Sequence, residues 1–224
     1  MHTQAKRKRT AALGAVAAIA AAAAAFTPMT ANAAAAPSTP QVRPAVVPAS
    51  APEVQVPAAV KSAAVASGGN YTYVEFKKGS SALNSRLKFI YVQATNPDHV
   101  RAWTIDSWRA GSGNGSKDSC ATNRGWLPNG TYKIKKFYWH HNGGARGVNG
   151  IAWDIGNHKC HSGKWRTELF IHSKMKPNGQ QGSGPYRWTG SYASNGCIKL
   201  SPHDIRELAG YRSNYPHPGK LYVD

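Results

Sequence analysis

The sequence predicts a mainly β domain, a β-sandwich or partly closed barrel with one or two short helices. Three observations lead to this fold class. Segments rich in aromatic and β-branched residues recur after residue 70, and several alternate between apolar and polar positions. Turns rich in Gly, Asn and Ser separate these segments. One stretch near the C-terminus carries the start and stop signals of a helix.

Each strand is predicted from its own composition. In the second segment, Leu87, Phe89 and Tyr91 share one face, as expected for a strand with one buried side. An Asn-Pro-Asp sequence at residues 96–98 follows and favours a hairpin turn. The expected strands are residues 71–76, 86–93, 100–106, 131–137, 151–155, 168–172, 196–200 and 221–223.

The expected helix begins after Ser201, a residue type that suits the N-cap position. Pro202 occupies the first helical position, and Asp204 places a negative charge in the first turn. We expect the helix to end at Gly210.

Residues 1–33 are typical of a signal peptide. Four basic residues at positions 6–9 precede an uncharged, Ala-rich run over residues 11–26, and residues 31–33 (Ala-Asn-Ala) have the pattern of a cleavage site. The run is shorter than the roughly 20 residues that a transmembrane helix needs. We therefore expect a secreted, cell-wall protein with no stable membrane span after cleavage. An uncleaved membrane anchor is the alternative.

Residues 34–69 are rich in Ala and Pro, with prolines recurring every three to five residues up to position 57. Such proline density disfavours helix and sheet, so we expect a disordered, semi-rigid linker here. Residues 70–224 then form one folded domain. It is long enough to bury a core, and we expect it to be monomeric.

The chain is strongly basic, with 28 Lys and Arg against 10 Asp and Glu and a formal net charge of +18. The folded part shares this character, since residues 70–224 contain 22 basic and nine acidic residues. Such a surface favours anionic cell-wall polymers as partners. No zinc-finger or RNA-binding aromatic motif accompanies the charge, so we expect no nucleic acid, and a secreted nuclease would rest on basicity alone.

Cys197 and His172 are the candidate catalytic residues. Cys197 lies between small residues and a short apolar run, where Gly196 allows close approach to the backbone and consecutive N–H groups can bind an anion. Basic surroundings are expected to lower the pKa of this thiol. His172 ends an apolar strand, and the backbone carbonyl of Ser173 can fix its tautomer. The alternatives are a small buried core cysteine and a core histidine with satisfied hydrogen bonds.

These segments resemble the catalytic motif of the L,D-transpeptidases (YkuD-type domain). Residues 170–173 (Phe-Ile-His-Ser), a long loop, and residues 194–200 (Ser-Asn-Gly-Cys-Ile-Lys-Leu) are similar to its His and Ser/Thr-His-Gly-Cys elements. Residues 127–134 resemble its Thr-Pro-x-Gly-x-Tyr-x-Ile segment, and residues 88–111 its opening hairpin. The likeness extends from about residue 86 to residue 211.

The resemblance implies a mechanism and a set of site residues. Cys197 is the nucleophile that attacks an L,D-amide of a peptidoglycan stem peptide, and His172, oriented by Ser173, is the general base and acid. The backbone N–H groups of Asn195, Gly196 and Cys197 form the oxyanion hole. No cofactor is needed. The expected substrate-binding residues are Tyr186, Trp188, Ser194 and Lys199.

Two features depart from the family pattern. Asn195 occupies the position of the motif histidine, which leaves the proposed base in place but changes the local electrostatics. The loop over residues 173–193 is long and carries Tyr186 and Trp188, so it is expected to reshape the acceptor pocket.

With Cys197 assigned as the nucleophile, Cys120 and Cys160 remain to form a disulfide, by elimination among the three cysteines of an exported chain. The pair His140 and His141 and the group around residues 158–161 match no common zinc spacing, so we expect no metal.

Three functions remain open. The leading hypothesis is an exported L,D-transpeptidase that forms cross-links through a thioester on Cys197. An L,D-carboxypeptidase or endopeptidase would use the same site, and the third alternative is a non-catalytic, basic wall-binding protein.

Overall fold

The computed structural model describes residues 45–66 and 69–224, so the predicted signal peptide over residues 1–33 lies outside the described part. No helix within these two ranges is long and apolar enough to cross a membrane. The strands are β1 (Glu53–Val54), β2 (Tyr71–Ser81), β3 (Asn84–Asn96), β4 (His99–Ser112), β5 (Gly130–Lys133), β6 (Lys136–Asn142), β7 (Asn149–Lys159), β8 (Trp165–His172), β9 (Ile198–Lys199) and β10 (Lys220–Val223). The helices are α1 (Ala58–Ala66) and α2 (Pro202–Gly210), with 3-10 turns η1 (Gly184–Tyr186) and η2 (Tyr211–Ser213).

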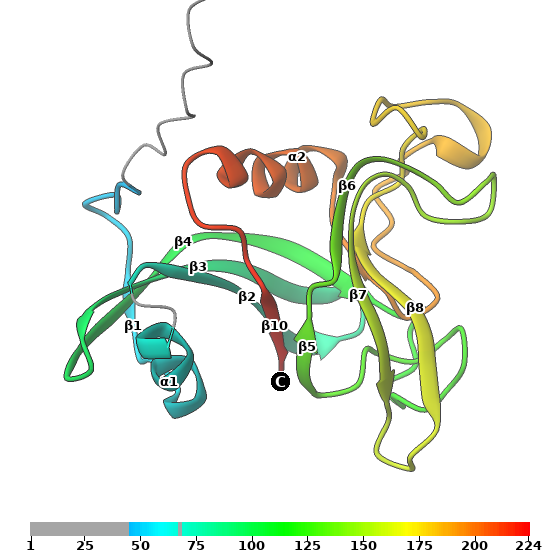
Figure 1. Ribbon diagram of the computed structural model, residues 1–224. Helices are drawn as coiled ribbons and strands as arrows, with labels where there is room; N and C mark the ends of the chain where they lie inside the picture. Colours follow the sequence, from blue (N-terminus) through cyan, green and yellow to red (C-terminus); the bar gives the residue numbers. More distant parts are fainter. Residues whose placement is uncertain (1–44, 67–68) are drawn as a thin grey trace, which may run out of the picture. The chain divides into compact units, whose positions relative to one another are not determined.

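The strands form one mixed sheet in the order β5-β10-β2-β3-β4-β9-β8-β7-β6, with β1 added to β4 (Figure 1). Because β5 and β6 stay at opposite ends of this path, the sheet curves without closing. The predicted mainly β fold with short helices is confirmed. Short β9 joins the two parts of the sheet, since it pairs antiparallel with β4 and parallel with β8.

Long antiparallel strands β2, β3 and β4 carry two apolar faces. Figure 1 shows α2 on one face of this layer and α1 on the other. On the α2 side, Phe89 and Tyr91 pack in a core that includes Ile205 and Leu208 of the helix. Between β3 and β4, the side chain of Asn96 accepts hydrogen bonds from the backbone of residues 98 and 99, which forms the predicted turn.

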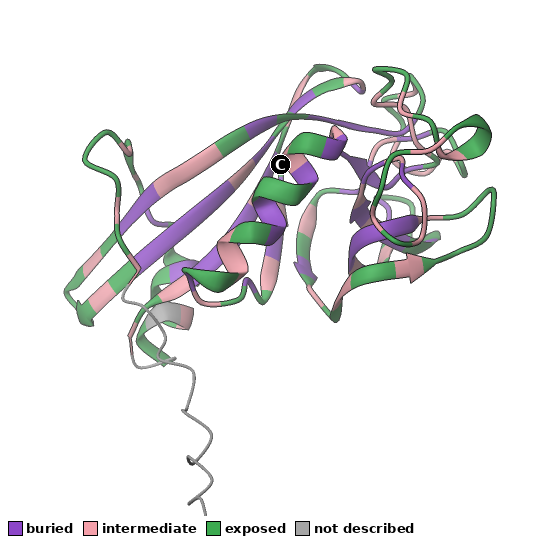
Figure 2. Ribbon diagram, turned by 90° about the horizontal axis from the view of Figure 1, so that it is seen from above, coloured by how far each residue is buried: buried purple, intermediate pink, exposed green. Residues whose placement is uncertain are grey.

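Helix α2 begins and ends where the sequence predicts. The Ser201 hydroxyl accepts a hydrogen bond from the N–H of Asp204 over 3.1 Å, and Pro202 is the first helical residue. In Figure 2 the buried residues of this helix lie along one side and the exposed residues along the other. The helix therefore covers the sheet with one apolar stripe.

The prediction of a disordered linker over residues 34–69 is wrong for its described part. Glu53 and Val54 pair with β4, and Val60 of α1 is fully buried against β2 and β3. The physical reason is local. Prolines stop at Pro57, and the Ala-rich sequence that follows is a good helix former in which Val60 is buried.

Residues 131–137 were expected to form one strand but form parts of two. The N–H of Ile134 donates to the carbonyl of Gly219, whereas the N–H of Lys135 donates to the carbonyl of Asp154. At this point the chain leaves β10, which is next to one edge of the sheet, and joins β7, which is next to the other. The alternation breaks at this crossing, where Lys135 and Lys136 are adjacent polar residues, so the single predicted strand ran through the break.

Candidate functional site

The two candidate catalytic residues lie on neighbouring strands. His172 is the last residue of β8, and Cys197 directly precedes β9. These strands run parallel with Ile171 opposite Ile198, and the N–H of Leu200 donates to the carbonyl of His172 over 2.9 Å. The pairing brings both side chains to one cavity of about 580 Å³.

The ring of His172 has a fixed proton position. Its Nδ1 lies 2.8 Å from the carbonyl oxygen of Ser173, and because a carbonyl can only accept, Nδ1 carries the proton. Burial lowers the pKa of His172 to about 4, and the charges of Lys199 and Lys174 act in the same direction. The imidazole is therefore neutral at neutral pH, with a lone pair on Nε2. The contact with Ser173 is the one expected from the sequence, and its catalytic role stays a prediction.

The thiol of Cys197 is protonated at neutral pH. Its S–H donates to the carbonyl oxygen of Glu168 over 3.5 Å. Burial raises the pKa of Cys197 to about 11, although the charge of Arg166 opposes this. The expected lowering of the thiol pKa is therefore wrong, because the cation does not offset the loss of water around the sulfur. No hydrogen bond joins Cys197 to His172, so the two groups rest as a neutral pair.

A bulge in β8 aims the Glu168 carbonyl at the thiol. Glu168 has a φ of 54°, which is unusual for a residue other than glycine, and its N–H donates to the side-chain oxygen of Asn157 over 3.1 Å. The register between β7 and β8 shifts on both sides of Gly156, which lies opposite Leu169. Bulges of this kind often redirect groups next to active sites.

Ser194 holds the backbone around Cys197. Its hydroxyl accepts from the N–H groups of Gly113 and Gly196 and donates to the carbonyl of Cys197 over 2.6 Å. The N–H of Gly196 is thus already bonded, which corrects its expected place in the oxyanion hole. The N–H groups of Asn195 and Cys197 have no acceptor among the described residues and remain available. Ser194 lines the cavity, but its hydroxyl has no free proton for a substrate.

Arg166 is a buried residue of the site that the sequence analysis missed. Only 4% of it is exposed, and its guanidinium donates to the carbonyls of Ser119, Trp126 and Asn195. A Cβ on Gly196, whose φ is 115°, would lie 1.9 Å from the guanidinium. Arg166 therefore joins the loop over residues 113–126 to the Cys197 loop, and only glycine fits between them. The strand composition gave no signal that this arginine points inward.

A family model for the L,D-transpeptidase catalytic domain (YkuD) matches residues 88–213, more than half of the chain. This chain belongs to that family. No curated protein matches the sequence. A solved structure of Bd1075 from Bdellovibrio bacteriovorus aligns with a TM-score of 0.43 at 13% identity, covering 70% of this chain and 48% of that one. The chain therefore spans about half the length of that structure.

The L,D-transpeptidase domain places the four expected substrate-binding residues differently. Ser194 and Lys199 line the cavity, whereas Tyr186 and Trp188 do not. Lys199 donates to the carbonyl of Ala193 over 3.0 Å and lies 5.2 Å from the ring centre of Trp188. Burial lowers the pKa of Lys199 to about 8. Trp188 thus contacts Lys199 and does not line the cavity itself, and the substrate-binding role of Trp188 and Tyr186 stays a prediction.

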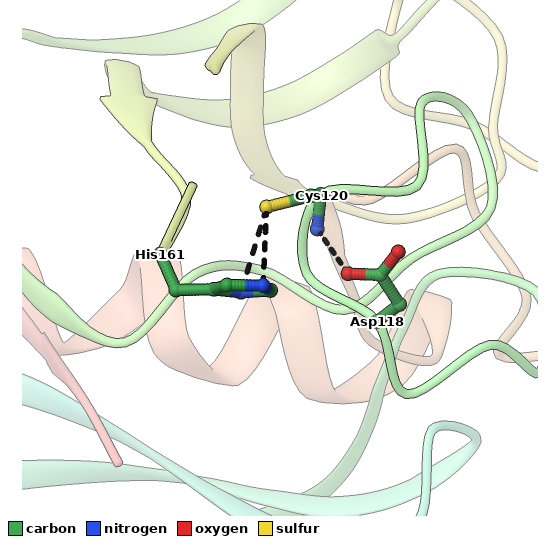
Figure 3. A group of neighbouring side chains, drawn as sticks. All are labelled: Asp118, Cys120 and His161. Carbon is green, nitrogen blue, oxygen red and sulfur yellow. Dashed lines mark hydrogen bonds between the residues drawn. The ribbon is translucent and has the colours of Figure 1, made fainter. Parts of the chain in front are cut away.

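The predicted disulfide between Cys120 and Cys160 is confirmed, with Cα atoms 5.3 Å apart. It anchors the loop that Arg166 binds. In Figure 3 the imidazole of His161 lies beside the Cys120 sulfur, and Asp118 accepts from the Cys120 N–H. These three residues are close enough to hold a metal, but the Cys120 sulfur is bonded to Cys160 and is not available as a thiolate.

Proposed function

We propose that this protein is an exported L,D-transpeptidase that cross-links peptidoglycan stem peptides through a thioester on Cys197. One observation carries the proposal: a buried thiol and a neutral imidazole line one cavity, beside two N–H groups. Neither Nε2 of the imidazole nor these two N–H groups has a hydrogen-bond partner within residues 45–66 and 69–224. A nucleophile, a base and oxyanion donors are the parts that acyl transfer requires.

The first half of the reaction forms the acyl-enzyme. The Cys197 proton passes to Nε2 of His172 as the sulfur attacks the L,D-amide carbonyl of the stem peptide. The free N–H groups of Asn195 and Cys197 hold the oxyanion, at about 3 kcal/mol per donor in comparable sites. When the C–N bond breaks, His172 returns its proton to the leaving D-alanine amine. Because the pair rests neutral, substrate must bring thiol and imidazole together before the proton moves.

The second half decides the product. Attack on the thioester by an amine of a second stem gives a cross-link, whereas attack by water gives a trimmed tripeptide. The proposed cellular location is the wall, reached by way of the signal peptide over residues 1–33. The Cys120–Cys160 disulfide supports an oxidising compartment, and the basic domain suits an anionic polymer.

Mass spectrometry of products tests the proposal directly. The purified full chain is incubated with tetrapeptide muropeptides beside its Cys197→Ala variant. We expect a cross-linked dimer from the unsubstituted protein, a thioester adduct on its intact mass, and neither from the variant.

The alternative functions give other products. Tripeptide without dimer would make the protein an L,D-carboxypeptidase with the same nucleophile. Stem peptides that bind without turnover would overturn the enzymatic proposal and leave a wall-binding protein.

A further inference from the structure

The cavity holds a second imidazole, His141, from the end of β6. Its Nδ1 lies 2.8 Å from the carbonyl oxygen of Val148, so Nδ1 carries the proton in the neutral ring. Its Nε2 makes no hydrogen bond with any described residue. His141 is also near enough to His172 that its charge lowers the pKa of that residue.

Local structure fixes this orientation. The register between β6 and β7 shifts between Tyr138 and His141. This shift is a β-bulge, and it takes His141 out of the alternating pattern of the strand. Beyond it, the buried side chain of Asn149 accepts from the N–H of Gly143 and donates to two loop carbonyls, so the hairpin over residues 142–149 is braced from inside. The Val148 carbonyl that binds His141 belongs to this braced loop.

The chemistry of the second half-reaction gives this imidazole a task. An alkyl amine acceptor is an ammonium ion near neutral pH and must lose two protons. One leaves before the nitrogen can attack. The other leaves as the C–N bond forms and the C–S bond breaks, and His172 delivers it to the departing sulfur. Attack by water needs only the second transfer, because the remaining proton leaves the carboxylic acid product by ordinary ionisation.

We propose that His141 takes the first proton from the acceptor ammonium and passes it to water, and so sets the partition of the thioester between amine and water. The inference rests on the proposed function. His172 is neutral again after acylation, and in the second half-reaction it carries the proton that goes to the departing sulfur. The cavity also contains Arg146, Lys174 and Lys199, with Glu168 as the one carboxylate among its lining residues. This excess of positive charge disfavours an ammonium ion and favours its loss of a proton.

A partition experiment on the full chain tests the inference. Acyl-enzyme is formed with tetrapeptide muropeptide, and the ratio of cross-linked product to tripeptide is measured against the concentration of acceptor stem. We expect His141→Gln to form acyl-enzyme at a rate within about twofold of the unsubstituted protein. The ratio of cross-linked product to tripeptide should fall about 100-fold, the low end of general-base effects. The control is His140→Gln, an exposed neighbour that does not line the cavity.

Hydroxylamine, used as a second acceptor, distinguishes proton removal by His141 from a purely structural role of this residue. Hydroxylamine is largely unprotonated at neutral pH and does not need the first transfer. We expect the His141→Gln acyl-enzyme to react with hydroxylamine as fast as that of the unsubstituted protein.

An unchanged partition in His141→Gln would overturn the inference, and so would an equal loss of rate with hydroxylamine as acceptor. The same change of partition in His140→Gln would also overturn it, as would the same change in Glu168→Gln, which removes the carboxylate of the cavity. If the unsubstituted protein forms no acyl-enzyme, the proposed function fails and takes this inference with it. An acyl-enzyme with normal partition in His141→Gln overturns the inference alone.

Discussion

The β2–β3–β4 layer and the β6–β9 part of the sheet are built by different rules. The first consists of long strands that bury apolar side chains on both faces. Their pairing continues through three register shifts, and a simple turn at Asn96 joins β3 to β4. The second is interrupted by bulges, by a left-handed Glu168 and by glycines that approach other groups closely. The groups of the proposed reaction all lie in the irregular part. Regular pairing gives stability here, and the departures from it aim polar groups into the cavity.

The largest effect is expected at His172, the proposed base, which is the last residue of β8 in the irregular part. His172→Gln removes the acceptor for the thiol proton, so acylation should slow by about 10²- to 10⁴-fold. The rate of thioester formation by intact-mass spectrometry measures this. A loss smaller than threefold would show that another group accepts the proton.

Arg166→Gln should lower the free energy of unfolding by about 3–5 kcal/mol, because each buried carbonyl left without a donor costs about 1–3 kcal/mol. Three carbonyls lose their donor in this variant. Lys88→Gln is the matched change in the regular layer, where Lys88 and Glu75 form a partly exposed pair at 2.9 Å. That change should cost less than about 1 kcal/mol. Urea unfolding of both variants makes the comparison, and equal losses would contradict it.

One face of the β2–β3–β4 layer could be predicted from sequence, because Leu87, Phe89 and Tyr91 are buried on the face that a period of two indicates, and Ser201 caps its helix locally. The burial of Ile90 and Val92 on the other face could not, because it depends on α1 covering that face. His172 and Cys197 were also found, since their motif is local and their strands are adjacent. Arg166 and His141 were not assigned to the site. A buried arginine and a bulge depend on distant carbonyls and on pairing register, neither of which leaves a local pattern. The pKa of Cys197 went in the unexpected direction because burial, which sequence does not measure, outweighs nearby charge.

The protonated thiol gives a pH prediction. With a pKa of about 11 in the folded protein against about 9 for an exposed thiol, Cys197 should hold about 100-fold less thiolate than the unfolded chain below pH 9. Alkylation of Cys197 by iodoacetamide should therefore be slow at pH 7.5 and rise about tenfold per pH unit up to about pH 10. The rate is followed by intact mass, with urea-unfolded protein as the reference. A fast, pH-independent rate near neutrality would indicate a thiolate–imidazolium pair instead.

The smallest effects come from paired polar changes, one in each part of the sheet. Asn96→Ala removes an exposed side-chain acceptor of the β3–β4 turn and should cost about 0.5–1 kcal/mol of stability without altering acylation. Ser194→Ala also removes one small polar group, but this group is a hydroxyl that binds the backbone of the site. Its loss frees the N–H of Gly196 and the carbonyl of Cys197. Its stability loss should be only about 1–2 kcal/mol, but acylation should slow because the nucleophile loop is no longer held. Unfolding curves and thioester rates on the two variants measure both quantities. If Asn96→Ala slowed acylation as much as Ser194→Ala, the division between a stabilising layer and a site-bearing layer would not hold.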